Sequence, residues 1–155
     1  MVTIDKNILI VSEVKLVYKT KVKASERPQI FNSQCAVDIF KMIWDDDILE
    51  HHEEMKLLLV NRSNKVLGFA NLSVGGVSGT VCDITSILQY AIKGNASGII
   101  LYHNHPSGNI NPSESDEKVT KRVNNALQAI EIKLLDHLII TSGKEYYSFA
   151  DNGLI

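Results

Sequence analysis

The sequence is poor in cysteine and has no long apolar run. Among its 155 residues only Cys35 and Cys82 are cysteines, so no disulfide framework is indicated and a reducing compartment suits the chain. No stretch approaches the roughly 18 consecutive apolar residues that cross a bilayer, and the first residues lack the basic, apolar and small-residue pattern of a signal peptide. We therefore expect a cytoplasmic protein with no membrane partner.

A large excess of charge of one sign is also lacking. The 16 Lys and Arg residues and the 18 Asp and Glu residues give a net charge of −2, which argues against tight non-specific binding to a phosphate backbone. An apolar content of 45% and a charged content of 22% are ordinary for a folded domain and argue against extensive disorder. The length is that of one domain with a substantial core, and composition leaves the oligomeric state open.

The most informative stretch begins with the apolar run Gly98–Leu101, whose length and composition are typical of a buried strand. Side chains two residues apart share one face of a strand, so His103 and His105 should project together from its carboxyl end. Pro106 and Gly108 then end the strand and turn the chain. Two imidazoles are thus expected side by side at the end of a strand.

A helix is expected to follow, with Ser113 as its N-cap residue. Asp116 lies in its first turn and begins an inward-facing stripe with Val119, Val123 and Leu127. Ser113 with an acid three residues later also fits a plain capping box, and a single histidine is more often a core or surface residue than a ligand. The combination favours a site, because buried polar groups without partners are costly.

Three nitrogen and oxygen ligands that leave one position open for water are the usual way to hold a catalytic zinc ion. His103, His105 and Asp116 therefore predict a Zn²⁺ site. Other zinc classes fit less well. The sequence has no His-Glu-x-x-His, it lacks the Pro-Cys-x-x-Cys that a nucleobase deaminase needs, and its two cysteines form no recognisable zinc motif.

These residues resemble the metal motif of a known family. His103-x-His105-Pro106, followed after six residues by Ser113-x-x-Asp116, is similar to the signature of the JAB/MPN domain, the JAMM metalloprotease motif. The resemblance is to the RadC branch of these domains in particular. The segments that carry it are His103–Gly108, Pro112–Asp116, Leu135–Ile140 and Tyr147–Ala150.

The resemblance covers residues 53–155 well and residues 1–52 only loosely, so we expect one JAB/MPN domain with N-terminal strands and a helix in the same globular unit. It implies an α/β fold of cytidine-deaminase-like type, with a mixed sheet flanked by helices, in agreement with the order of the elements. The pattern predicts strands at 8–11, 16–18, 55–61, 66–74, 98–101, 134–141 and 146–149, helices capped by Ser33, Thr85 and Ser113, and a glycine-rich turn at 75–79.

The resemblance also implies a general base and a serine that binds the substrate. In JAB/MPN domains the base is a glutamate at the start of the strand that precedes the hairpin. Glu53 and Glu54 both stand there, and strand alternation lets only one of them face the metal. The family spacing to Asn61 favours Glu53. Ser113 corresponds to the family serine that hydrogen-bonds the substrate carbonyl.

Three further residues are candidates for a supporting role. Asn104 and Ser107 lie within the motif and can orient the ligands from outside the metal's own ligand set. His137, which follows Asp136 in an apolar run, is either such a partner or a structural histidine, and the sequence does not decide between these roles.

The function implied by the resemblance is that of a zinc-dependent hydrolase of peptide or isopeptide bonds. The alternative is a non-catalytic or DNA-associated module, since the RadC branch carries a DNA-repair label. The sequence feature in its favour is the basic cluster of Lys19, Lys21, Lys23 and Arg27, for which a solvated strand face is the simpler interpretation. The sequence does not identify the substrate.

Overall fold

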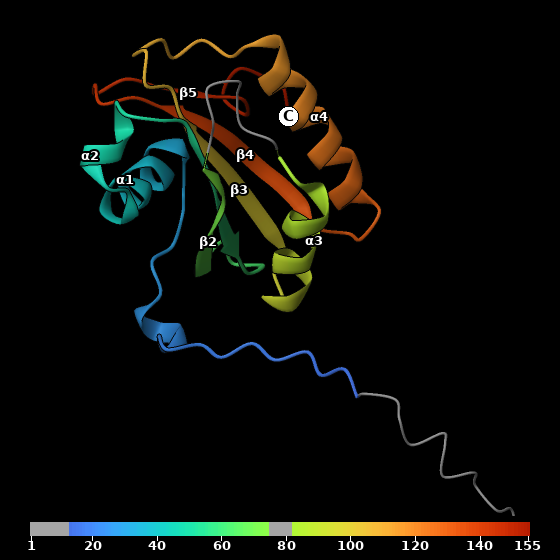
Figure 1. Cartoon of the computed structure of the whole chain (residues 1–155). Helices are drawn as coiled ribbons and strands as arrows, with labels where there is room; N and C mark the ends of the chain where they lie inside the picture. The colour runs from blue at the N-terminus through green and yellow to red at the C-terminus, as the bar shows by residue number, and fades with distance from the viewer. Residues whose placement is uncertain (1–12, 75–81) are drawn as a thin grey trace, which may run out of the picture.

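Five strands form one mixed sheet with helices packed on both of its faces (Figure 1). The computed structural model describes residues 13–74 and 82–155. In chain order the elements are a 3-10 helix (Ala24–Glu26), α1 (Ser33–Ile43), α2 (Asp46–Leu49), β1 (Glu54–Val60), β2 (Val66–Val74), α3 (Ile84–Lys93), β3 (Gly98–Asn104), α4 (Glu114–Gln128), β4 (Lys133–Ile140) and β5 (Tyr146–Ser148). No helix of the described residues is long and apolar enough to cross a membrane. The predicted α/β class with a mixed sheet is confirmed.

The strand order β2-β1-β3-β4-β5 decides which loops meet. β1 runs antiparallel to both β2 and β3, so Met55 near its start pairs with His103 near the end of β3. β3 and β4 are parallel, and α4 makes the crossover between them. The start of β1 and the N-terminus of α4 therefore both lie beside the carboxyl end of β3, where open α/β sheets bind their ligands.

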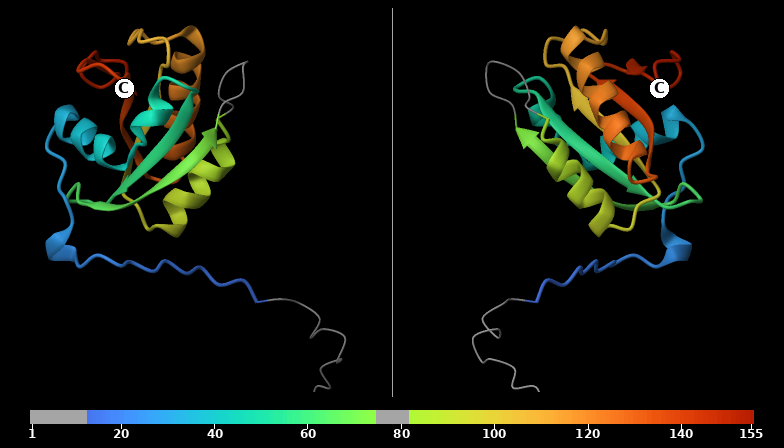
Figure 2. Two further views of the ribbon diagram at one scale, coloured as in Figure 1. Left: turned by 60° about the vertical axis from the view of Figure 1, so that its left-hand side comes forward. Right: turned by 90° about the vertical axis from the view of Figure 1, so that its right-hand side faces the viewer.

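Each face of the sheet carries its own apolar core. On one face α1 buries Val37 and Phe40 against Tyr102 of β3. On the other face α3 and α4 bury Ile87 and Leu127, and the two views of Figure 2 show these helices across the sheet from α1. Burying a side chain of this size contributes about 1.5–3 kcal/mol. Because β3 is packed on both faces, its carboxyl end is a firm support for a site.

Two of the predicted helix caps are wrong by one and two residues. α1 is capped by Asn32 instead of Ser33, with the Asn32 side chain accepting a hydrogen bond from the backbone N–H of Cys35 at 2.8 Å. α3 is capped by Asp83 instead of Thr85, and the Asp83 carboxylate accepts from the Thr85 N–H at 3.1 Å. Asn and Asp are at least as good as Ser and Thr at this position, so residue type alone could not separate neighbouring candidates.

The predicted N-terminal strand at residues 16–18 is not part of the sheet. These residues are extended and exposed, and they pair with no strand of the described chain. The predicted strand at 8–11 and the glycine-rich turn at 75–79 lie outside the described residues. The hairpin of β1 and β2 and the antiparallel pairing of β4 with β5 are confirmed.

Asn104, the last residue of β3, ties this strand to the turn that leads into β1. Its side chain is fully buried. The side-chain oxygen accepts from the Glu54 N–H at 2.7 Å, and the amide donates to the carbonyls of Leu49 at 2.9 Å and His52 at 2.8 Å. Asn104 was predicted to orient metal ligands, but its hydrogen bonds instead fix the backbone on both sides of residue 53.

We predict that Asn104→Ala lowers the free energy of unfolding by about 2–4 kcal/mol, because it leaves one backbone N–H and two carbonyls without their partner in the protein interior. Urea denaturation measures the change. Asn125→Ala, at an exposed position of α4, is the matched control, and its free energy of unfolding should stay within about 0.5 kcal/mol of that of the wild type. Equal effects of the two substitutions would contradict this role of Asn104.

Candidate metal centre

Four side chains converge at the carboxyl end of β3. Glu53, His103, His105 and Asp116 each place one nitrogen or oxygen atom within 4.8 Å of those of the other three. Glu53 comes from the turn before β1, the histidines from the end of β3, and Asp116 from the first turn of α4. Such a group of imidazoles and carboxylates could hold a metal ion.

The two histidines point toward the same place, as the strand alternation predicted. His103 is fully buried and His105 is partly buried, and their Nε2 atoms are 2.8 Å apart. Each ring also faces Asp116, with His103 Nε2 at 3.3 Å from Oδ1 and His105 Nε2 at 3.5 Å from Oδ2. Three donor atoms are therefore aimed at one small volume.

The hydrogen bond on the far side of His105 fixes which nitrogen carries its proton. His105 Nδ1 lies 2.6 Å from the backbone carbonyl of Asn109. A carbonyl can only accept, so Nδ1 is the donor and, in the neutral ring, Nε2 keeps a free lone pair. That lone pair points toward His103 and Asp116.

A chain of three hydrogen bonds fixes the proton on His103 in the same way. The Thr120 hydroxyl donates to the Asp116 carbonyl at 2.6 Å and so accepts from His137 Nδ1, also at 2.6 Å. His137 is fully buried, and burial keeps it neutral by lowering its pKa well below the usual range. Its Nε2 therefore accepts from His103 Nδ1 at 2.8 Å, which leaves the Nε2 of a neutral His103 free.

Free lone pairs on both Nε2 atoms at 2.8 Å repel one another unless a cation lies nearby. A proton or a metal ion removes this repulsion, and the carboxylates of Asp116 and Glu53 favour the positive charge. The donor set and the proton positions on the outer nitrogens are those of imidazoles ready to bind a metal through Nε2. The residues present therefore fit a metal ion.

Asp116 serves the helix and the cluster at once. Its Oδ2 accepts from the Ser113 N–H and from the Ser113 hydroxyl, both at 2.7 Å, and Ser113 Oγ accepts in turn from the Asp116 N–H at 3.1 Å. This is a capping box. Oδ1 takes no part in it and faces His103. The sequence allowed Asp116 to be either a capping residue or a metal ligand. The structure is compatible with both roles, because Oδ2 belongs to the capping box and Oδ1 faces His103.

The protonation states agree with this arrangement. Burial alone would raise the pKa of Asp116, but His103 and His105, whose Nε2 atoms donate to the carboxylate when a second proton makes either ring cationic, hold that pKa well below its usual range, so the carboxylate is ionised. Burial works toward a lower pKa for His105, yet the Asp116 carboxylate and the Asn109 carbonyl outweigh it and raise the pKa. The cluster thus favours positive charge beside Asp116.

Glu53 and Glu54 point to opposite faces of β1. Glu53 belongs to the cluster of ligand-type atoms, whereas Glu54 is buried on the α1 face. Glu54 Oε2 accepts from Lys56 Nζ at 3.0 Å, and its Oε1 lies 3.1 Å from His52 Nε2. Burial would raise the pKa of Glu54, but Lys56 and His52 together lower it. Glu54 is therefore half of a buried ion pair and not the solvated acid that a strand start would suggest.

The other predicted residues have distinct places. Ser113 is at the cleft, but its hydroxyl hydrogen is used by Asp116. Ser107 is exposed and accepts a long hydrogen bond of 3.4 Å from the Asn109 N–H, so it supports the turn whose carbonyl holds His105. Thr120 was not predicted. The available signal was a hydroxyl four residues after Asp116, on the inward face of the same helix.

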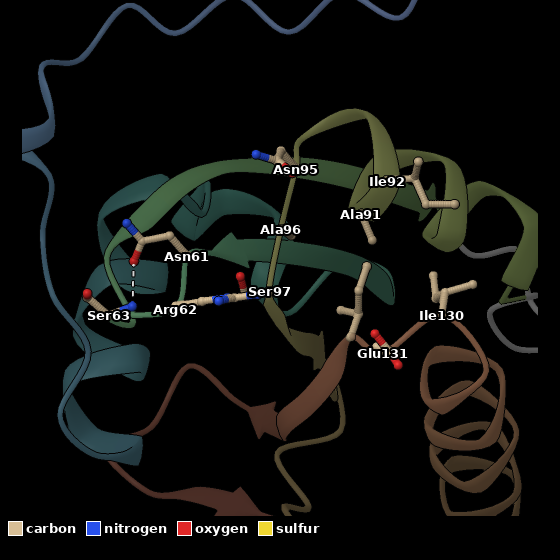
Figure 3. Close-up of a pocket in the computed structure, with 11 residues that line it drawn as sticks. Asn61, Arg62, Ser63, Ala91, Ile92, Asn95, Ala96, Ser97, Ile130 and Glu131 are labelled. Atoms are coloured by element: carbon tan, nitrogen blue, oxygen red, sulfur yellow. Dashed lines mark hydrogen bonds between the residues drawn. The ribbon is translucent and has the colours of Figure 1, made fainter.

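The cluster opens into a shallow cleft of about 450 Å³. Its lining consists of Glu53, His105, Pro106, Ser107, Asn109, Asn111, Pro112, Ser113 and Asp116. A larger hollow of about 670 Å³ lies at the opposite end of the sheet, between the β1–β2 turn and the loops before β3 and β4 (Figure 3). Of its lining side chains only Arg62 and Glu131 are charged, so it lacks a comparable group of metal-ligating atoms.

Residues 32–154 match a family model described as the RadC-like JAB domain. The "UPF0758 protein" of Flavobacterium johnsoniae is 48% identical over 103 residues, which make up 66% of this chain and 44% of the relative. The "UPF0758 protein" of Porphyromonas gingivalis is 50% identical over 103 residues, with coverages of 66% and 45%. The "UPF0758 protein YfjY" of Escherichia coli is 39% identical over 103 residues, with coverages of 66% and 64%.

The chain therefore spans less than two thirds of the length of each of these relatives, and their names state no activity. All four residues of the cluster fall inside the matched range of 32–154.

We predict that Thr120→Val weakens the affinity for a divalent metal ion by about 10- to 100-fold, because His137 loses the acceptor that fixes its proton and, through it, the proton of His103. Competition with a chromophoric chelator measures the affinity. Thr120→Ser keeps the hydroxyl and should bind nearly as tightly as the wild type. Equal weakening by both substitutions would mean that the methyl group, and not the hydroxyl, matters at this position.

Proposed function

The chain belongs to the RadC-like JAB domain family, and we propose that it is a zinc-dependent hydrolase of peptide or isopeptide bonds. The observation that carries the proposal is the convergence of Glu53, His103, His105 and Asp116 at the mouth of an open cleft. Two imidazoles and a carboxylate are the ligands that catalytic zinc takes, and a fourth acidic group beside them has the chemistry of a base.

His103, His105 and Asp116 would hold the zinc ion, His103 and His105 through Nε2 and Asp116 through the oxygen that the capping box leaves free. Zinc in such a site acts as a Lewis acid toward a carbonyl oxygen and lowers the pKa of a water ligand to about 7. Glu53 would accept the proton of the attacking water and return it to the amine that leaves. Glu53 lines the cleft, and Lys56 pairs with Glu54 and not with Glu53, so the Glu53 carboxylate is available to accept this proton.

Ser113 would donate its hydroxyl hydrogen to the substrate carbonyl oxygen as negative charge develops there. The same hydrogen now goes to Asp116 at 2.7 Å, so the hydroxyl has to rotate toward the substrate. The capping box survives this rotation in part, because the Ser113 and Asp116 backbone N–H groups keep their acceptors. A donor of this kind typically contributes about a hundredfold to a thousandfold in rate.

The charge of the cleft supports an amide over a phosphodiester as substrate. Among the described residues that line it, none is a lysine or arginine, and two are carboxylates, Glu53 and Asp116. Phosphoryl groups carry negative charge that increases in the transition state and is usually met by Arg, Lys or additional metal ions. An amide carbonyl is neutral before attack and imposes no such demand.

A DNA-associated module is the second candidate, and its support is the basic cluster Lys19, Lys21, Lys23 and Arg27. These residues approach the sheet at its hairpin end, where Tyr18 bonds the Leu67 carbonyl. The metal cluster lies at the other end of the seven-residue strand β1, about 20 Å away by strand rise. The basic cluster and the cleft are therefore separate surfaces, and a DNA strand would have to span both of them to be a substrate of the metal site.

We predict that the purified protein binds about one zinc ion per chain, measured by elemental analysis after exposure to zinc and removal of the excess. His103→Ala or His105→Ala should abolish this binding, and Asp116→Asn should weaken it, because a neutral amide is a poorer zinc ligand than a carboxylate. A wild-type protein that stays free of zinc under these conditions would contradict the proposal.

We predict that Glu53→Gln keeps zinc and thermal stability close to the wild type, while hydrolysis of a peptide or isopeptide library falls by about a hundredfold or more. The matched control is Glu54→Gln, the same change one residue along the strand. It breaks a buried ion pair and should lower the melting temperature, yet the activity per folded molecule should change little.

The two glutamate variants separate several outcomes. Loss of activity in Glu54→Gln alone would place the base at residue 54 and contradict the assignment of Glu53. A zinc-loaded wild type that cleaves no member of the library, but binds DNA in a salt-dependent way, would favour the second candidate.

A further inference from the structure

The N-terminal arm, residues 13–23, has the pattern of an amphipathic strand. Its even positions are Val14, Leu16, Tyr18, Thr20 and Val22, and its odd positions from 15 to 23 are lysines except for Val17. Alternation with period two places the apolar side chains on one face and the lysines on the other. Such a strand is suited to the edge of a sheet, with its lysine face in water.

The structure shows this arm extended but without a strand partner. Val14 is 90% exposed, Leu16 68% and Val22 46%. Figures 1 and 2 show the arm leaving the domain instead of lying along it. It is hydrogen-bonded to the sheet through the Tyr18 hydroxyl, which donates to the Leu67 carbonyl of β2 at 2.7 Å. An exposed apolar row of this length is unusual for a chain that stays monomeric.

β2 offers an edge of matching length. It is the outermost strand on its side of the sheet and spans nine residues, as does the arm from Val14 to Val22. Among the described residues, the backbone hydrogen bond made to its outer edge is the one from the Val66 N–H to the Pro28 carbonyl at 2.9 Å. Phe69, on β2, is 50% exposed and would gain cover from an added strand. Unpaired edges of this kind readily accept another strand.

The arm of the same molecule is poorly placed to fill this edge. Residues 28–30 meet the chain just before β2 through a single antiparallel bridge between Gln29 and Lys65. Continued toward the N-terminus, this pairing would run along β2, but the 3-10 helix Ala24–Glu26 interrupts it. Tyr18 then touches the edge only with the tip of its side chain. The backbone of the arm therefore lies a side-chain length away from β2.

Charge favours a second copy as the partner. Residues 13–27 contain five Lys or Arg against two Asp or Glu, and residues 28–155 contain ten against fifteen. The arm is thus positive and the domain negative, so the arm of one molecule is attracted to the domain of another. An exchange of arms between two copies uses the same two surfaces twice and closes with two-fold symmetry.

We propose that the protein forms a two-fold dimer in which residues 14–22 of each copy add as a strand to the outer edge of β2 in the other. The added strand extends the sheet, with Leu16 and its even-numbered neighbours on one face and the lysines on the other face, in water. The inference is independent of the metal site, because it rests on the outer edge of β2, whereas the cluster is built from the start of β1, the end of β3 and the first turn of α4.

Sedimentation velocity of the full chain from about 1 to 100 µM tests the proposal, with a dimer expected. Leu16→Asp should raise the dimer dissociation constant by about tenfold or more, because it puts a charge on the buried face. Val17→Asp is the matched control, because it makes the same kind of change one residue along, on the lysine face. Its dimer dissociation constant should stay within about twofold of that of the wild type. Both side chains are exposed in the single chain, so neither variant should unfold the domain.

A wild type that is monomeric over this range overturns the proposal, including the case in which the arm folds onto its own β2. A dimer that both substitutions leave intact is held by another surface and overturns it too. Equal weakening by Leu16→Asp and Val17→Asp would show that net charge, and not the alternation of a strand, controls the association, and would also count against it.

Discussion

A loop of hydrogen bonds that starts and ends at Asp116 is the constraint on which the site depends. The backbone carbonyl of this residue accepts from Thr120, Thr120 accepts from His137, and His137 accepts from His103. His103 then presents its remaining nitrogen to the carboxylate of Asp116. The bonds that join His137 to Thr120 and to His103 are buried and the bond from Thr120 to Asp116 is partly buried, so each lost bond would leave a polar group poorly satisfied. The first turn of α4 thus sets both the position of the Asp116 carboxylate and the ring nitrogen of His103 that carries the proton.

The sheet brings these groups together because it is mixed. A parallel pair alone, β3 and β4 with α4 between them, sets the histidines against a helix N-terminus. The antiparallel neighbour β1 adds the residue that precedes its own start, and that residue is Glu53. Asn104 then holds the entry to β1 through three hydrogen bonds from the last residue of β3. A fully parallel sheet would carry the start of β1 to the other end, away from the histidines.

Local pattern was sufficient for the five strands of the sheet, for α1, α3 and α4, and for the histidines. It was insufficient for α2, for residues 16–18, which it predicted as a strand, and for the connections between the elements. Alternation placed His103 and His105 on one side of a strand, and three-residue spacing placed Asp116 at a helix start, because both rules depend on neighbours in sequence. Asn104 and Thr120 could not be assigned in this way. Their partners lie on other elements, 50 residues away for Glu54 and 17 for His137. The predicted N-caps of α1 and α3 were wrong for a different reason, because several adjacent polar residues were equally suitable as N-cap.

Charge balance links the site to its proposed chemistry. With both imidazoles neutral, Glu53 and Asp116 give the cluster two negative charges and no cationic side chain to offset them. The second acid of the pair, Glu54, adds nothing to this charge, because Lys56 compensates it on the opposite face of β1. A divalent cation brings the cluster to neutrality, which is the state that a partly buried site tolerates best. In the proposed reaction the substrate carbonyl is neutral and leaves this balance unchanged, whereas a phosphate would restore the negative charge. The same two carboxylates therefore favour the metal ion and are compatible with the uncharged amide that we propose as its target.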